Sequence, residues 1–268
     1  QRFNRLYLRK HFHTVVVNRD RISQIQLQPT DSLVVYANHA SWWDPLAALY
    51  MADSLFPEYS MYAPIDAEAF EKYRVFGRMG FFPVEQGSLK GAKDFLSIGR
   101  RILSEQGTSL WITPEGRFAD VRDDAAELTP GLSHLAWQIA TQGVGQVDDA
   151  DHRIWFLPAA VEYTFWEERL PELLIWFGQP MLVRDAKHAA GSRTDGGDKS
   201  DWQQLLTGAM RDAQKELAEQ SIARNALAFE VLLRSKSGTF FVYDWWRSLT
   251  SRLRGRDFDS DHSQLLKD

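Results

Sequence analysis

His39 and Asp44 lie five positions apart in the segment NHASWWDP, which spans residues 38–45. A neutral imidazole can take a proton from a substrate hydroxyl. A carboxylate on its other ring nitrogen fixes the tautomer and stabilises the imidazolium that forms. The pair therefore predicts general-base catalysis in which the protein supplies no nucleophile of its own.

The residues around this pair predict a strand-to-helix turn. The preceding run, LVVYA at 33–37, is typical of a buried strand, and LAALY at 46–50 has the apolar spacing of a helix. A histidine and an aspartate at this spacing also occur by chance, so a second segment is needed. SLWI at 109–112 indicates another buried strand, and it runs into TPEGR at 113–117, a polar turn of the kind that carries function at strand ends. We expect both turns to share one edge of a sheet.

The first turn resembles the glycerophosphate and lysophosphatidic acid acyltransferase family. That family's first motif, Asn-His-x-Ser-x-x-Asp, is matched in full by Asn38, His39, Ser41 and Asp44, which includes the His-x4-Asp spacing. The third motif, Phe-Pro-Glu-Gly-Thr-Arg, is matched in part by the segment TPEGR. The fourth motif, an apolar strand with a central proline, is similar to the segment LPAAV. The resemblance covers residues 33–165.

The resemblance implies acyl transfer from a thioester, with acyl-CoA or acyl carrier protein as co-substrate and neither a cofactor nor a metal. His39 is then the general base on the acceptor hydroxyl, and Asp44 orients it. The activated oxygen attacks the thioester carbonyl directly. Backbone N–H groups near Gly116, or at the helix start after Asp44, are the expected donors to the tetrahedral oxyanion.

The other motif residues have supporting roles in this reading. Glu115 is expected to organise the site or to bind acceptor hydroxyls, and Gly116 and Arg117 complete that turn. Asn38 and Ser41 are expected to brace the first turn. These five residues and Gln86 make up the predicted substrate-binding region.

The second motif departs from the family. The family ends an apolar strand with an Arg that holds the acceptor phosphate, whereas the segment GFFPVEQ ends in Gln86. Arginine grips phosphate through bidentate, charge-assisted hydrogen bonds that glutamine cannot make. Arg117 is the best-placed replacement. Three further cations are alternatives that also fit a solvated surface: Arg74, Arg78 and Lys90.

Two acceptors therefore stay open. The first is a lysophospholipid of the 1-acylglycerol-3-phosphate type, which would place the protein in phospholipid biosynthesis. The second is a phosphate-free hydroxyl, such as that of a glycolipid or a glycosylated carotenoid, which Gln86 favours. A thioesterase that uses water as acceptor and an inactive lipid-binding protein are further alternatives.

Composition excludes several classes. The chain has no cysteine, so it has no disulfide framework and no thiol nucleophile. The sequence lacks the nucleophile elbow of a serine esterase and the helix-spaced histidine pair of a common zinc site. The net charge of −5 gives no reason to expect a nucleic-acid partner.

A membrane surface is the expected partner. No apolar run reaches the length of a transmembrane helix. Residues 1–10 are basic and amphipathic, and residues 240–256 combine clustered aromatics with four arginines, a composition that favours an anionic lipid surface. The alternative is that these aromatics pack on the core. We expect a cytoplasmic protein associated peripherally with the inner face of the membrane.

The element pattern predicts one α/β domain over residues 1–268, with a mixed, mostly parallel sheet flanked by helices. The motif-bearing core is expected at about 30–185, and a helical part at about 200–255. The predicted strands are 14–17, 23–27, 33–37, 59–63, 81–84, 109–112, 154–163 and 173–178. The predicted helices are 44–54, 67–78, 88–106, 131–142, 201–234 and 239–253.

Overall fold

One mixed sheet organises the chain in the computed structural model, which describes residues 2–123, 125–144, 152–184 and 198–235. Within them the sheet has nine strands: eight follow the order β4-β3-β5-β2-β6-β7-β1-β9, and the ninth, β8, pairs with β6. The strands are β1 Thr14–Val17, β2 Ser32–Ala37, β3 Ser60–Asp66, β4 Phe81–Val84, β5 Thr108–Ile112, β6 Ile154–Thr164, β7 Glu172–Phe177, β8 Met181–Leu182 and β9 Glu230–Arg234. Neighbours from β4 through β6 are parallel, while β7 and β8 run antiparallel to β6. The predicted fold class is confirmed.

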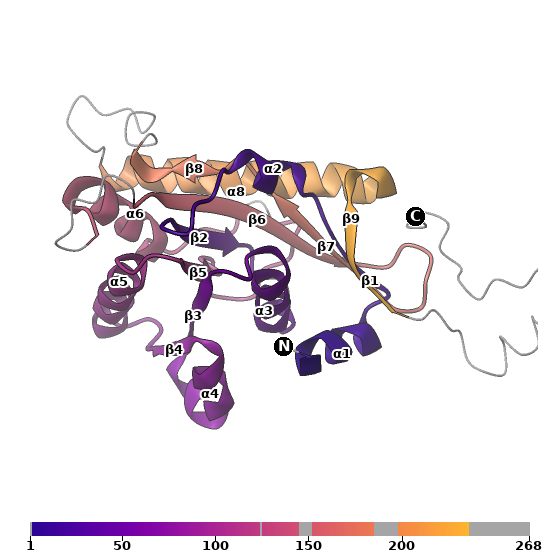
Figure 1. The fold of residues 1–268 in the computed structure, drawn as a ribbon, viewed down its shortest axis with the longest axis horizontal. Helices are drawn as coiled ribbons and strands as arrows, with labels where there is room; N and C mark the ends of the chain where they lie inside the picture. The colour runs from indigo at the N-terminus through magenta and orange to yellow at the C-terminus, as the bar shows by residue number, and fades with distance from the viewer. Residues whose placement is uncertain (1, 124, 145–151, 185–197, 236–268) are drawn as a thin grey trace, which may run out of the picture.

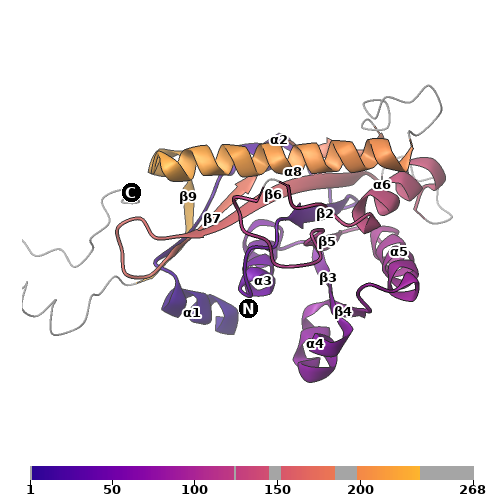
Figure 2. The same cartoon turned by 180° about the vertical axis from the view of Figure 1, so that it is seen from behind.

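Helices cover both faces of this sheet (Figure 1). The α-helices are α1 Arg2–His11, α2 Asp20–Gln24, α3 Asp44–Leu55, α4 Ala67–Lys72, α5 Leu89–Leu103, α6 Gly131–Gln142 and α8 Lys199–Ile222, and the 3₁₀ helices are η1 Arg74–Met79 and η2 Ala226–Ala228. Helix α8 lies along β6 and β7, and seen from behind it crosses in front of the sheet (Figure 2). Helix α3 lies on the opposite face, with α1 packed beside it.

Side chains alternate between the two faces along the central strand β2. Leu33 and Val35 enter the core beneath α3, whereas Val34 and Tyr36 enter the core beneath α5, α6 and α8. All four side chains are at most 1% exposed. A strand buried on both faces has to be apolar throughout, which explains the uninterrupted run LVVYA. Burying each such side chain contributes about 1.5–3 kcal/mol.

Two predicted elements are wrong. No strand forms at 23–27: residues 20–24 form helix α2, and the buried Ile25 that ends this helix is extended and donates its N–H to the carbonyl of Ile22 at 3.0 Å. The helix predicted at 201–234 ends at Ile222. The chain then turns through Arg224, whose φ is 48°, and forms β9, which pairs antiparallel with β1. The expected helical C-terminal part therefore contributes a strand to the sheet.

Other differences are smaller. The helix predicted at 67–78 is divided at Tyr73 into α4 and η1. The short strand β8 was not predicted. The helix predicted at 239–253 and the basic aromatic segment 240–256 lie outside the described residues.

Candidate active site

The two polar turns leave the same edge of the sheet. Strands β2 and β5 are parallel neighbours in which Tyr36 is paired with Ile112, one residue before the end of β2 and at the end of β5. The turns at 38–44 and 113–117 therefore begin side by side. This arrangement confirms the shared edge that the sequence predicts.

His39 and Asp44 meet across the first turn. Nδ1 of His39 lies 2.6 Å from Oδ2 of Asp44, and the same oxygen accepts the backbone N–H of Ser41 at 3.0 Å. Asp44 is 7% exposed and is the first residue of α3, where the helix dipole favours a negative charge. A neutral His39 facing this carboxylate carries its proton on Nδ1, which leaves Nε2 as a proton acceptor.

The face of His39 that carries Nε2 is open. The side chain is 20% exposed, and no group in the described part of the chain hydrogen-bonds to Nε2. The ring of Phe118 lies against the imidazole at a centroid distance of 4.4 Å, and Phe118 is itself 57% exposed. The imidazole is therefore partly accessible at the surface, beside an exposed aromatic ring.

Tyr163 is a contact of this pair that sequence reasoning missed. Its hydroxyl donates to Oδ1 of Asp44 at 2.6 Å, so both carboxylate oxygens hold donors. Burial, together with the adjacent charge of Asp44, raises the pKa of Tyr163 well above its usual range, and the hydroxyl stays protonated. The sequence feature that could have pointed to Tyr163 is the alternation of side chains along β6, which puts Ala159, Val161 and Tyr163 on one face of the sheet.

Asn38 and Ser41 contact only the turn and its support. The buried amide of Asn38 donates to the carbonyl of Val161 at 3.0 Å and accepts the N–H of the same residue at 2.7 Å. Ser41 Oγ accepts the N–H of Trp43 at 3.3 Å. These contacts fit the predicted bracing of the turn.

Glu115 joins the second turn to the first. It is 5% exposed, and its Oε2 accepts the backbone N–H of His39 at 2.7 Å. Its Oε1 lies 3.8 Å from Nη1 of Arg211 on α8, a residue that carried no signal in the sequence because its contact spans almost a hundred positions. Both oxygens are engaged within the protein, which fits an organising role better than the binding of acceptor hydroxyls.

Gly116 is required by the conformation of its turn. Its φ is +65°, and a Cβ at this position would lie 3.0 Å from the methyl group of Thr129. Its N–H donates to the carbonyl of Thr113 at 3.1 Å. That N–H is therefore not free to bind an oxyanion, so a donor near Gly116 has to be another backbone N–H of this turn.

The helix start after Asp44 is also engaged. The N–H groups of Leu46 and Ala47 both donate to the carbonyl of Trp43, at 3.0 and 2.9 Å. By contrast, the N–H groups of Ala40 and Arg117 have no hydrogen-bond partner within the described ranges. One of these groups belongs to each turn, and both are better candidates for oxyanion donors.

Of the four cations considered in place of the missing Arg, Arg117 follows the strand closest to β2. It follows β5, next to β2, and its side chain is 63% exposed and only loosely paired, 4.0 Å from Asp123. Gln86 follows β4, three strands from β2, which at a strand spacing of about 4.8 Å puts it roughly 14 Å away. Arg78 and Lys90 are exposed as well, while Arg74 is paired with Glu71 at 2.7 Å.

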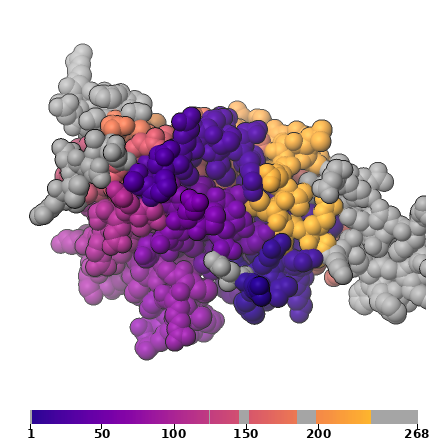
Figure 3. All heavy atoms as spheres, viewed as in Figure 1, coloured from indigo at the N-terminus to yellow at the C-terminus, as the bar shows by residue number. Residues whose placement is uncertain are grey.

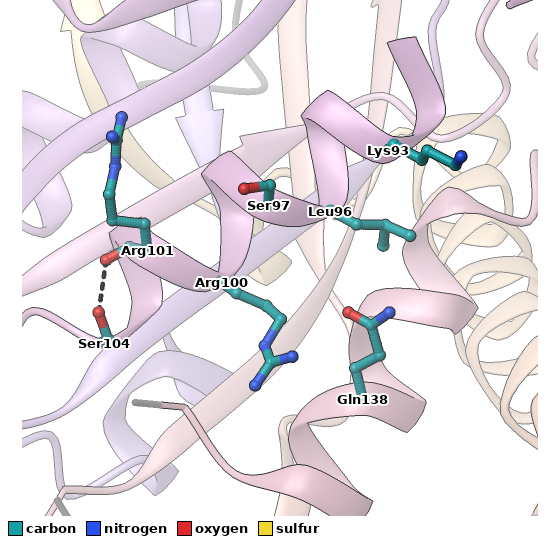
Figure 4. A pocket seen from close by; sticks show the side chains of 7 residues that line it. All are labelled: Lys93, Leu96, Ser97, Arg100, Arg101, Ser104 and Gln138. Atoms are coloured by element: carbon teal, nitrogen blue, oxygen red, sulfur yellow. Dashed lines mark hydrogen bonds between the residues drawn. The ribbon is translucent and has the colours of Figure 1, made fainter. Parts of the chain in front are cut away.

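Two surface grooves lie apart from this site. One, of about 560 Å³, follows α5 and is lined by Lys93, Leu96, Ser97, Arg100, Arg101, Ser104 and Gln138. Its two arginines point in different directions (Figure 4). The other, of about 610 Å³, lies where the segment 125–130 meets α6 and the start of α8. None of the predicted site residues lines either groove.

The chain matches a known protein family. A family model described as Acyltransferase matches residues 13–160, more than half of the chain. The matched range contains both turns. No curated protein matches the chain. Within the described residues, no helix has the length and apolar character needed to cross a membrane, and no three side chains of the metal-binding types come together.

Proposed function

The chain belongs to the acyltransferase family, and we propose from this premise that it transfers a fatty acyl group from acyl-CoA or acyl carrier protein to a hydroxyl of a lysophospholipid. One observation carries the proposal: the imidazole of His39 is held through Nδ1 by Asp44, with Nε2 open to the surface. This is the arrangement of a general base that acts on a hydroxyl from outside the protein.

The chemistry follows from that arrangement. Nε2 of His39 takes the proton of the acceptor hydroxyl, and the oxygen attacks the thioester carbonyl. The negatively charged Asp44 stabilises the imidazolium that forms, and the backbone N–H groups of Ala40 and Arg117 are the proposed donors to the oxyanion. The tetrahedral intermediate collapses with cleavage of the carbon–sulfur bond, and the imidazolium returns the proton to the departing thiolate.

The acyl donor and the acceptor are tested by CoA release from palmitoyl-CoA, with lysophosphatidic acid, a neutral glycolipid or no acceptor. Release that requires lysophosphatidic acid is the expected result. Release only with the glycolipid would move the function to acylation of a phosphate-free acceptor, which the neutral Gln86 favours. Release that is independent of any acceptor would indicate a thioesterase. The same arms with palmitoyl-acyl carrier protein decide the donor.

Arg117 is the proposed phosphate-binding residue, and Arg117→Ala is expected to raise KM for lysophosphatidic acid. The loss of a charge-assisted contact corresponds to about a 10-fold to 100-fold effect, with a much smaller change in kcat. Initial rates over a range of acceptor concentrations measure the change. Arg74→Ala is the matched control, because Arg74 is exposed and paired with Glu71. An equal rise in KM for both variants would contradict the role of Arg117.

Helix α1 is the proposed membrane-binding element. It lies on the surface beside β9 (Figure 3), and the rings of Tyr7 and His11 contact Trp43 at tilted angles next to the catalytic turn. Phe3 and Leu6 of this helix are 78% and 65% exposed, among several cations of the same helix. Exposed apolar side chains interleaved with cations favour an anionic lipid surface.

The double variant Phe3→Ser/Leu6→Ser is expected to weaken binding to anionic liposomes by at least about tenfold, since each side chain loses about 1.5–3 kcal/mol of burial in lipid. Co-sedimentation at low salt measures it. Ile222→Ser is the control, because Ile222 is 84% exposed at the end of α8. Unchanged binding of the double variant, or a loss shared with the control, would exclude α1 as the anchor.

A further inference from the structure

We infer that Tyr163 is a positioning residue that lowers the basicity of His39 through Asp44. This inference rests on the proposed general-base role of His39. The hydroxyl of Tyr163 has no other acceptor in the described part of the chain, and it donates to Oδ1 of Asp44 at 2.6 Å. The same carboxylate accepts His39 Nδ1–H through Oδ2. Tyrosine and histidine therefore share one negative charge.

Tyr163 is held by its strand and by a neighbouring aromatic ring. Its backbone is paired with Leu173 of β7. Its ring lies 5.8 Å from that of Phe12, and Phe12 meets Trp43 edge-on at 5.0 Å. Trp43 directly precedes Asp44. The donor and its acceptor are thus fixed by one cluster of aromatic rings, so the short hydrogen bond is a product of the packing and not of a mobile side chain.

A donor on Oδ1 has two effects on the pair. It fixes the plane of the carboxylate, so that Oδ2 stays in line with Nδ1 of His39. It also draws electron density toward Oδ1, which weakens the pull of Asp44 on the His39 proton. Removing the hydroxyl should therefore strengthen the stabilisation of the imidazolium and raise the pKa of His39. A base with a higher pKa is protonated over more of the acidic range.

The other charged groups near His39 are the same with and without this hydroxyl. Glu115 meets the backbone N–H of His39 from the turn after β5, and Arg211 lies behind Glu115 on α8. Arg117 follows in the same turn as Glu115. Their influence cancels in a comparison of wild type with Tyr163→Phe.

The test is Tyr163→Phe beside Tyr50→Phe. The hydroxyl of Tyr50, also on the α3 side of the sheet, donates to the carbonyl of Leu232 at 2.8 Å, so the control loses a comparable hydrogen bond that does not touch the carboxylate. The His39 titration is followed by NMR of the imidazole nitrogens, and the pH dependence of kcat is followed by CoA release. For Tyr163→Phe we expect a rise of about half a pKa unit or more, the same upward shift of the acidic limb of the rate profile, and a fall in kcat at neutral pH that is no larger than this shift, about threefold for half a unit.

An unchanged or lowered His39 titration in Tyr163→Phe, or an equal rise in Tyr50→Phe, would overturn the inference. Failure of the proposed function is distinguishable. If the wild type releases no CoA with any acceptor, the acyl transfer proposal fails, whereas the NMR titration still decides whether Tyr163 acts on His39.

Discussion

Replacing His39 with alanine is expected to reduce acceptor-dependent CoA release by about a thousandfold or more. Without the imidazole, no group in the described turns can take the proton of the hydroxyl, because Asp44 and Glu115 hold their donors from within the protein. General-base catalysis contributes about 10²–10⁴-fold, and the alignment of the base adds to it. Single-turnover and steady-state CoA release at saturating acceptor measure the loss.

His134→Ala is the control for this substitution, since His134 lies on α6 and belongs to neither turn. Asp44→Asn is the companion variant: it keeps the shape of the side chain but removes the negative charge that holds His39, and a loss of comparable size is expected. Circular dichroism and thermal unfolding show whether each variant is folded. A folded His39→Ala protein with more than a tenth of wild-type activity would remove His39 from the mechanism.

The first turn was predictable from the sequence because its chemistry is local. His39 and Asp44 are one turn apart along the chain, and the apolar run before them and the helix after them fix the geometry between. Parallel neighbouring strands end at one edge, so the meeting of this turn with Glu115 follows from the prediction of two buried strands. In both cases a short stretch of chain contains nearly all of the necessary information.

The partners from further along the chain were not predictable in this way. Tyr163 reaches Asp44 across 119 positions, and Arg211 reaches Glu115 from a helix that reads simply as amphipathic. Which residue of a strand or helix arrives at the site depends on register and rotation, and apolar periodicity gives only the face. Strand β9 was missed for a related reason: the run after Ile222 is too short to show a period of its own, and its partner β1 is far away in the chain.

The second large predicted effect is on protein stability, and it is due to Glu172. It is fully buried at the start of β7, where Oε2 accepts the N–H of Trp166 at 3.0 Å and Oε1 has no partner among the described residues. Burial and, to a smaller extent, the nearby Glu168 raise the pKa of this carboxyl to about 7, against the opposing effects of backbone hydrogen bonds and Arg224. Its charged form is therefore disfavoured in the folded protein.

The sign of the pH dependence follows from linkage. In the unfolded chain Glu172 titrates near 4.5, so between pH 4.5 and about 7 the folded state binds more protons than the unfolded state. The contribution of Glu172 to the free energy of unfolding is therefore fully present below pH 4.5, and this contribution is lost as the pH rises to about 7. The loss is at most about 3 kcal/mol, because one pKa unit corresponds to about 1.4 kcal/mol.

Glu172→Gln should remove this loss. The amide oxygen can still accept the N–H of Trp166, while no charge has to be buried, so the variant is expected to be more stable than wild type at pH 8 by about 1–3 kcal/mol and equal to it near pH 4.5. Urea unfolding at several pH values gives the difference between the two curves. Glu162, whose pKa is also raised by burial, titrates in both proteins and cancels in that difference. Glu71→Gln, at an exposed position, should leave the curve unchanged. If the free energies of unfolding of Glu172→Gln and wild type change in parallel from pH 4.5 to 8, Glu172 is already ionised at low pH in the folded state. Its buried oxygen would then accept a hydrogen bond.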